Sequence, residues 1–486
     1  MKWIPLLLLV STLAEVGISV RAQGQAPARR YVVLDLPSIS SFSARAFDLN
    51  NRGDAVGHGL SPSLQQHALS WSGTSVVDLS PANPLAEAQG ISESGLVAGW
   101  AQNAVGRMEA VRWTSGQLAF LGMLPGHIGS CAQDVNDQGL VAGWSITSVG
   151  DPTAAVWSNG QIQAIGGAFS WAFAVSETGA VVGRRWVGVD IQAFRWRNQQ
   201  LTVLPDLGLP YASAVGISPG GRMAGSALSP ADQRLHAVLW ADDLDLTDLG
   251  LFFGLSTAAL DVNDAGVAVG NVLDAQGDVI LAAVWRGNGA EDLNALIQPG
   301  SGWFLKEAQA INERGEIVGF GTSNGMQAQR PYLLRPDCDG DGISDLDEIA
   351  AGTADDSNHD GVADECQHCQ TDLGFAGPGA MGLRVCGDPL TLQGSSATVA
   401  LTQVPGGMPV FLVVGLTNQP TPIAGGMLVP APLLILSGFV AAPDGSIRFP
   451  LHGSAALPQA IFVQAVALVG PLVQFSNALR VVIGLL

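Results

Sequence analysis

Twelve residues from Asp337 to Glu348 place carboxylates and a glycine at the spacing that a hard cation requires. Acidic side chains stand at positions 1, 3, 5, 9 and 12 of this loop, and glycine stands at position 6. The expected ligands, the last of them through its backbone carbonyl, are Asp337, Asp339, Asp341, Asp345, Glu348 and Ile343. We expect Ca²⁺ rather than Mg²⁺, because the loop is flexible and strongly anionic.

A second copy of the loop follows at once. Its expected ligands are Asp356, Asn358, Asp360, Val362 and Asp364. Position 12 is Gln367 rather than glutamate, which predicts weaker binding or a borrowed carboxylate. Residues 337–366 hold eleven acids and no Lys or Arg, so a solvated acidic linker is the alternative. A glycine at position 6 of both copies favours cation binding, since charge alone does not require it.

Cysteines surround the acidic segment, which is typical of an oxidising compartment. The four are Cys338, Cys366, Cys369 and Cys386. Two disulfides are expected, most simply Cys338–Cys366 and Cys369–Cys386, although three pairings are possible. A zinc site built on Cys366 and Cys369 is the alternative. The fifth cysteine, Cys131, is expected to be a buried free thiol.

Aspartate loops that alternate with cysteines, as in residues 337–370, resemble the calcium-binding thrombospondin type 3 repeats. The resemblance covers this short segment alone. It implies a linker that stiffens when calcium binds and holds the flanking domains in a fixed relation.

A motif that the chain repeats seven times forms the domain before this segment. Each copy has an apolar residue, a turn beginning with Asn or Ser, a glycine, three mostly apolar residues and a second glycine. The copies are Leu49–Gly57, Ile91–Gly99, Val135–Gly143, Val175–Gly183, Ile217–Gly225, Val262–Gly270 and Ile311–Gly319. Such a pattern predicts a β-hairpin, because the Asn or Ser caps the turn and glycine supplies its positive φ.

Each hairpin is followed by a third apolar run and, except in the last copy, by a fourth. The third runs end at Trp71, Trp113, Trp157, Trp196, Trp240, Trp285 and Leu334, which are 39 to 49 residues apart. Four short strands at this period are typical of a propeller blade. A surplus strand at Tyr31–Leu36 can supply the fourth strand missing from the last repeat. We therefore predict an all-β fold in which residues 28–335 form a seven-bladed β-propeller closed by an N-terminal strand. A linear β-solenoid, the alternative, gives no reason for the strand count at the two ends.

The units Ala193–Trp196 and Ala310–Gly319 resemble the bacterial extracellular repeats of the HAF type, and His67 and His236 keep the histidine of that pattern. The resemblance covers all seven units. It implies an extracellular repeat protein and no particular activity.

The two ends of the chain bear on export and attachment. Residues 1–22 have a charged start, an apolar stretch and a small-residue cleavage site, which predicts a signal peptide and an exported protein. No later segment is apolar and long enough to predict a transmembrane helix. Residues 372–486 contain alternating apolar runs and turns, which predict a C-terminal β-sandwich. Its few charged residues suit docking on the propeller, on a second copy of the chain or on the cell envelope.

The net charge of −20 argues against nucleic acid as a partner. Variable connections at one face of the propeller favour a binding function. Trp100, Trp144, Arg184 and Trp186 would form an aromatic and cationic patch for sugar or peptide, unless they pack between blades. The predicted function is a secreted, calcium-stabilised binding or adhesion module for an extracellular glycan or protein.

An extracellular propeller enzyme acting on polysaccharide, a hydrolase or lyase, is the alternative function. No nucleophile motif, phosphate loop or zinc-binding histidine pair supports it. Asp48, Asp134 and Asp261 precede the turn Asn of three repeats, and we expect them to satisfy backbone groups inside their own blades.

Overall fold

The structure is a computed structural model of the whole chain. It describes residues 30–82, 85–241, 244–287, 289–326, 328–337, 342–354, 356, 363, 368–369, 371–372, 381–387, 396–402, 404, 408–423, 426–430, 434–440, 447–452, 459–469 and 472–483. The predicted signal peptide lies outside these residues.

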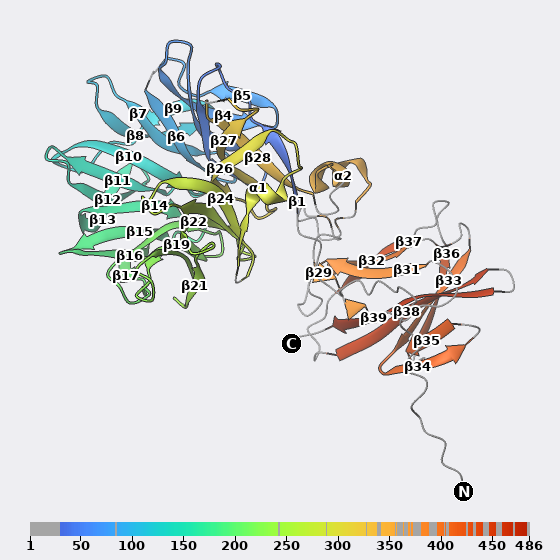
Figure 1. Cartoon of the computed structure of the whole chain (residues 1–486). Helices are drawn as coiled ribbons and strands as arrows, with labels where there is room; N and C mark the ends of the chain where they lie inside the picture. Colours follow the sequence, from blue (N-terminus) through green and yellow to red (C-terminus); the bar gives the residue numbers. More distant parts are fainter. Residues whose placement is uncertain are drawn as a thin grey trace, which may run out of the picture.

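The chain from Arg30 to Asp337 forms antiparallel sheets of four strands each (Figure 1). The first comprises β2 (Ala44–Leu49), β3 (Ala55–Leu60), β4 (Gln66–Ser72) and β5 (Ser75–Asp78). The second comprises β6 (Ala86–Ile91), β7 (Val97–Gln102), β8 (Met108–Thr114) and β9 (Gln117–Phe120). The third comprises β10 (His127–Val135), β11 (Val141–Thr147), β12 (Pro152–Ser158) and β13 (Gln161–Ala168).

The next three sheets repeat this order. The fourth comprises β14 (Ser170–Val175), β15 (Val181–Val187), β16 (Asp190–Arg197) and β17 (Gln200–Val203). The fifth comprises β18 (Ala212–Ile217), β19 (Met223–Leu228), β20 (Leu235–Trp240) and β21 (Leu246–Gly250). The sixth comprises β22 (Ser256–Val262), β23 (Ala268–Leu273), β24 (Val279–Trp285) and β25 (Ala290–Asp292), and a short helix, α1 (Leu293–Leu296), follows it.

The last of these sheets joins distant parts of the chain. Its order is β1–β28–β27–β26, built from β26 (Trp303–Ile311), β27 (Ile317–Ser323), β28 (Arg330–Asp337) and β1 (Arg30–Asp35). Val33 lies opposite Leu334 and Leu34 opposite Leu333 in this antiparallel pairing. The surplus strand at the start of the described chain is therefore the fourth strand of the last repeat.

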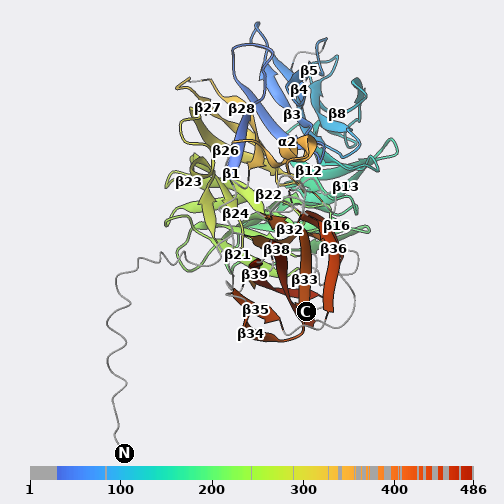
Figure 2. The same cartoon turned by 90° about the vertical axis from the view of Figure 1, so that its right-hand side faces the viewer.

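The sheets follow one another in chain order around a common centre (Figure 2). Each sheet contacts the next, and β27 of the last sheet contacts β2 of the first. One apolar cluster at that junction contains Ala46 and Trp71 from the first sheet and Val318 and Leu333 from the last. Apolar residues on the two faces of each sheet are thus buried against the neighbouring sheets.

The tryptophan that ends most third strands is a buried anchor with a polar contact. Trp71, Trp113, Trp240 and Trp285 are no more than 1% exposed. The indole nitrogen of Trp113 donates to the carbonyl of Leu79 at 2.9 Å, on the connection that enters its sheet. The rings of Trp71, Trp113 and Trp240 fill the space between sheets while their N–H groups donate to backbone carbonyls, whereas the buried N–H of Trp285 has no hydrogen-bond partner.

The second glycine of the motif lies opposite a β-bulge in the innermost strand. In the third sheet the register shifts between Ala132 and Asp134, so Gln133 is the extra residue. A Cβ atom at Gly143 would lie 2.1 Å from the carbonyl oxygen of Cys131, which no side chain can tolerate. The equivalent glycines in the other six sheets meet an inner-strand carbonyl in the same way. This close approach explains why the motif ends in glycine.

The acidic segment and the C-terminal region hold the remaining elements. They are α2 (Asp345–Ala351), β29 (His368–Cys369), β30 (Thr371–Asp372), β31 (Gly382–Gly387), β32 (Ser396–Thr402), β33 (Pro409–Gly415), β34 (Asn418–Ile423), β35 (Gly426–Pro430), β36 (Leu434–Val440), β37 (Ile447–His452), β38 (Gln459–Val469) and β39 (Leu472–Ile483). One sheet has the order β29–β31–β32–β37 and another β30–β39–β38–β33–β36. A shared apolar cluster includes Leu383 and Leu401 of the former and Leu412 and Val481 of the latter. Among the described residues, no helix is long and apolar enough to cross a bilayer.

Candidate functional site

The innermost strands of residues 30–337 enclose a cavity of about 180 Å³ at the centre of the sheets. The extra residue of the bulge opposite each motif glycine lines it: Phe47, Gln89, Gln133, Phe173, Val215, Leu260 and Gln309. A bulge re-aims one side chain out of the alternating pattern of its strand. The bulges therefore give the cavity a belt of seven side chains, three of them glutamines.

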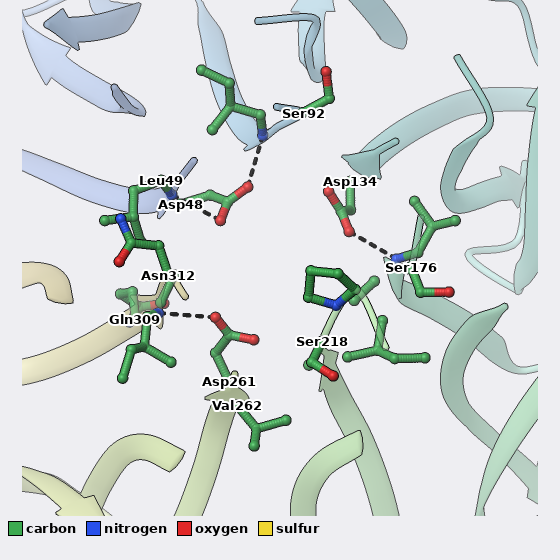
Figure 3. Close-up of a pocket in the computed structure, with 18 of the residues that line it drawn as sticks. Asp48, Leu49, Ser92, Asp134, Ser176, Ser218, Asp261, Val262, Gln309 and Asn312 are labelled. Carbon is green, nitrogen blue, oxygen red and sulfur yellow. Dashed lines mark hydrogen bonds between the residues drawn. The ribbon is translucent and has the colours of Figure 1, made fainter. Parts of the chain in front are cut away.

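Three aspartates link neighbouring sheets, and each comes directly after a belt residue in the sequence (Figure 3). They are Asp48, Asp134 and Asp261. The Oδ2 atom of each accepts a hydrogen bond from a backbone N–H at the end of the next sheet's inner strand. The donors are Ile91 at 2.7 Å from Asp48, Val175 at 2.7 Å from Asp134 and Ile311 at 2.9 Å from Asp261. In all three pairs the aspartate lies one sheet before its donor. The prediction that these aspartates act inside their own blades is therefore wrong in part, because each blade's aspartate reaches its neighbour.

The pKa values of these three carboxyl groups are raised, so they ionise at a higher pH than exposed aspartates do. Burial raises the pKa of Asp134 to about 7, against backbone hydrogen bonds that lower it. Burial also raises the pKa of Asp261 to about 7, and that of Asp48 lies well above its ordinary value because of burial and the charge of Asp134. Desolvation dominates in all three, since the groups lie in a narrow cavity with no ion partner in its lining.

The turn residues of the motif form a second tier of links. The side-chain amide of Asn136 donates to the carbonyl of Ser176 in the next sheet at 3.0 Å. Asn312 makes the same bond to Asn50 at 3.0 Å, across the junction of the last and first sheets. Glu313 accepts from the backbone N–H of Asp264 at 3.0 Å, and its pKa is raised to about 7 by burial first. Where the motif turn begins with Asn, it is thus tied to the turn of the next sheet.

The cavity offers acids with raised pKa values, about 7 for Asp134, Asp261 and Glu313, and a pKa near neutrality is the property of a general acid or base. Its acidic lining residues are Asp48, Glu93, Asp134, Glu177, Asp261 and Glu313. Every one of them accepts backbone N–H bonds from a neighbouring turn or strand. The same groups therefore hold the sheets together, and sequence-equivalent positions supply them. Their role in this structure is to accept hydrogen bonds that link the sheets.

Arg184 of the predicted aromatic and cationic patch packs against two rings of β14 that were not predicted to belong to it. The guanidinium of Arg184 lies 5.1 Å from the ring centre of Trp171 and 5.6 Å from that of Phe173. Trp186 is 48% exposed, two residues further along β15. Trp100 and Trp144 occupy the position equivalent to Arg184 on β7 and β11 and are half-buried. No ligand contact tests this patch, and it stays a prediction.

Equivalent positions in other sheets make contacts between sheets. His58 Nδ1 lies 3.0 Å from Glu87 of the following sheet. Phe320 packs under the guanidinium of Arg45, 4.4 Å from its ring centre, across the junction of the last and first sheets. The alternative of packing between blades therefore describes these two positions.

Exposed apolar side chains gather at one end of the sheets. Among the described residues from 30 to 337, three large exposed apolar residues lie on the fourth, outer strand of a sheet: Val77, Phe120 and Val203. The others lie near the end of the second strand of a sheet or near the start of its first, innermost strand. They are Phe42, Leu64, Leu85, Val105, Ile128, Val149, Phe169, Trp186, Val187, Val189, Phe253, Phe304 and Met326. We call this the loop end. The opposite end, formed by the motif turns, is polar.

The acidic loop is described in part. Asp337, Asp345 and Glu348 are between 1% and 9% exposed, and Ile343 is half exposed. Gly342 has φ +94°, and its N–H donates to Asp337 Oδ2 at 3.1 Å. Ser344 caps α2, whose first turn carries Asp345 and Glu348.

Several predicted residues cannot be placed. Asp339, Asp341, Asn358, Asp360, Val362 and Asp364 lie outside the described residues, as do Cys338 and Cys366. Within the described part of the chain, no three His, Cys, Asp or Glu side chains meet as a metal-binding group. Asp356 is described without the four other expected ligands of its loop, so the second loop stays a prediction.

Of the four cysteines expected to form disulfides, Cys369 and Cys386 lie in described strands, and the other two do not. Cys369 in β29 lies directly opposite Cys386 in β31, which is the arrangement that the simplest pairing needs. The disulfide itself stays a prediction. Cys131 is a buried free thiol, as predicted, and burial raises its pKa to about 12.

These observations define a nearly all-β, propeller-like protein. No protein-family model matches the chain, and no curated protein matches it by sequence. Among solved structures it is similar to TolB from Acinetobacter baumannii, at 12% identity and a TM-score of 0.34 over 62% of this chain; it spans 65% of the length of TolB.

Two further structures are similar over comparable lengths. A gluconolactonase from Xanthomonas campestris shares 11% identity, with a TM-score of 0.31 over 65% of this chain and 99% of its own. A lectin from Aleuria aurantia, in complex with alpha-methyl-L-fucoside, shares 12% identity, with a TM-score of 0.30 over 62% of this chain and 92% of its own. Values this low carry no conclusion about function.

Proposed function

We propose that this protein is an exported, calcium-stabilised β-propeller that binds an extracellular glycan or protein through its loop end, without catalysis. Residues 28–335 would form seven blades in a closed ring, and residues 372–486 a β-sandwich suited to the cell envelope. The signal-like start at residues 1–22 and the cysteine content support export.

The strand pairing between β1 and β28 supports the closed ring, as does the contact between β27 and β2. Hydrogen bonds cross this junction as they cross internal ones, since Asn312 bonds Asn50 in the way that Asn136 bonds Ser176. A linear solenoid would leave Asn50 and Asn312 at opposite ends of the stack.

The distribution of exposed apolar residues is the observation that carries the binding function. Val105, Val149 and Val189 stand at the tips of equivalent loops on three consecutive sheets and are 76%, 80% and 92% exposed. Isolated surface valines need no explanation, but the gathering of the three most exposed ones at one end of the sheets does. Loops of variable sequence on a rigid scaffold are where binding sites are usually found.

Calcium is proposed on the chemistry of the donor set. Three buried carboxylates, a positive-φ glycine at position 6 and a backbone N–H folded back onto position 1 fit a loop that holds a hard cation. Asp337, Asp345 and Glu348 would bind it through side chains and Ile343 through its carbonyl, together with Asp339 and Asp341. Calcium would supply charge neutralisation and a fixed loop.

The enzyme alternative would use the central acids. Their use as acceptors for backbone N–H groups supports a structural role instead, because a general base must be free to take a substrate proton. Glu93, Glu177 and Glu313 would have to release the neighbouring turns before acting.

A glycan and peptide array, read with and without EGTA, tests the binding function. Val149→Asp and Val189→Asp should each reduce binding of any ligand about tenfold, because a charge replaces apolar contact area. Val203→Asp is the matched control, since Val203 is an exposed valine on an outer strand. Equal losses in all three variants would refute binding at the loop end. Release of product from a bound polysaccharide would favour the enzyme.

A further inference from the structure

The first residue of the acidic loop is also the last residue of β28. Asp337 lies opposite Arg30 of β1 in the antiparallel pairing. Its side chain accepts the N–H of Gly342, five residues further along the loop. A cation held by Asp337 would therefore be attached directly to the strand pair that joins the two ends of residues 30–337.

Arg335, two residues before the loop, bridges the loop to the last sheet. Its Nε lies 3.0 Å from Oε1 of Glu316, and its Nη1 lies 3.5 Å from Oδ1 of Asp347 in α2. The side chain of Glu316 is fully buried, whereas that of Asp347 is 60% exposed. Glu316 depends on Arg335, because a buried carboxylate without a cation is strongly destabilising.

Glu316 in turn is bonded to the seam between the last and first sheets. The side-chain amide of Asn312 donates to Glu316 Oε2 at 2.7 Å and to the carbonyl of Asn50 at 3.0 Å. Gly53 of the first sheet also packs here, since a Cβ at this position would lie 3.2 Å from Glu316 Oε2. A continuous series of polar contacts therefore runs from α2 to the first sheet.

We propose that cation binding in the acidic loop stabilises this seam through Arg335, so that calcium controls how firmly the ring is closed. The inference rests on the calcium site of the proposed function. Without a cation, the loop's carboxylates repel one another and compete with Glu316 for the guanidinium of Arg335. With calcium bound, the loop's charge is neutralised, α2 is held in place and Arg335 stays on Glu316.

The distribution of tryptophan makes the seam measurable in the full chain. Every tryptophan after Trp3 lies between Trp71 and Trp303, and residues 304–486 contain none. Tryptophan emission therefore follows unfolding of the ring and not of the acidic segment or the C-terminal region. At calcium a hundredfold above the dissociation constant, the midpoint of thermal unfolding should rise by about 4 °C.

Arg335→Gln tests the route. This variant should still release or absorb heat on calcium titration, but the calcium-induced rise in the midpoint should fall by at least half. Arg330→Gln is the matched control: Arg330 lies on the same strand and pairs with Asp35 of β1 at 2.8 Å, away from the loop. It should lower the midpoint slightly and keep the full calcium-induced rise.

Hydrogen exchange of the unmutated protein gives a second measurement should Arg335→Gln fail to fold. Backbone amides of Tyr31–Asp35 should exchange at least tenfold more slowly with calcium than with EGTA. The absence of calorimetric heat would overturn the calcium site itself. Heat without a change in the midpoint or in exchange would overturn the coupling alone. A full calcium-induced rise in Arg335→Gln would overturn the role of Arg335.

Discussion

Replacing Asp134 by asparagine should change the free energy of unfolding of residues 30–337 in a pH-dependent way. Asp134 accepts the N–H of Val135 through Oδ1 and that of Val175 through Oδ2. Asparagine has one acceptor oxygen, so one buried N–H loses its partner. That loss costs about 1–3 kcal/mol at a pH where the wild-type carboxyl is protonated.

The wild-type protein loses free energy of unfolding at higher pH, because the buried carboxyl of Asp134 must then ionise. Its folded pKa of about 7 lies above the ordinary value of 3.8, so the folded state binds the proton more tightly than the unfolded state. The resulting stability is fully present below the unfolded pKa and is lost as the pH rises through 7. A shift of about three units corresponds to about 4 kcal/mol, and roughly half that figure where cavity water screens the charge.

The two effects together predict a crossover. Asp134→Asn should be less stable than wild type at pH 5 and equally or more stable at pH 8. Urea unfolding followed by tryptophan emission measures both, at one saturating calcium concentration. An equal loss of stability at the two pH values would refute the assignment of a proton to Asp134.

Three further predictions test other parts of the structure. Asn312→Ser keeps the turn cap found at Ser218 but removes the amide that reaches both Asn50 and Glu316, and should cost about 1–3 kcal/mol by urea unfolding. Ser218→Ala should cost less, because the Ser218 side chain bonds its own turn. Gly143→Ala should prevent folding or cost more than 3 kcal/mol, on the order of a severe core substitution, while Gly160→Ala, with no atom within 4 Å of its Cβ, should cost only about 1 kcal/mol for its positive φ. Calorimetric titration of the full chain should lose a calcium-binding heat in Asp341→Ala and keep it in Asp360→Ala; the opposite result would move the stronger site to the second loop.

The repeat itself was predictable because its turn chemistry is local. Asn136 and Gly139 fix a hairpin through a side-chain cap and a positive φ, and both effects act within a few residues. The surplus strand at Tyr31 was also visible as a difference in strand number between the two ends. Most apolar runs after residue 396 coincide with strands for the same reason, whereas the hairpin of β34 and β35, rich in proline and glycine, gave no such pattern.

The central cavity could not be predicted, because it depends on register. In the sequence Gln133 looks like an ordinary inner-strand residue. Its side chain lines the cavity because it is the extra residue of the β-bulge opposite Gly143. The second glycine was the available signal: a glycine kept within a strand indicates a bulge or a close backbone approach. The reach of Asp134 into the next sheet was likewise invisible, because it joins residues 41 positions apart.

The repeated residues and the variable residues therefore do different work. Asn136 ties a turn to the next sheet, Asp134 links two inner strands and Gly143 lies opposite a bulge. The Asn link is found at four junctions between sheets, the Asp link at three, and the glycine in all seven sheets. The loop tips at Val105 and Val189 meet no such demand, and their side chains are left in water. Since exposure of apolar surface is unfavourable, its concentration at the end that is free to vary is best explained by a partner that covers it. Sheets held together by their own repeated residues can change those loops without changing their fold.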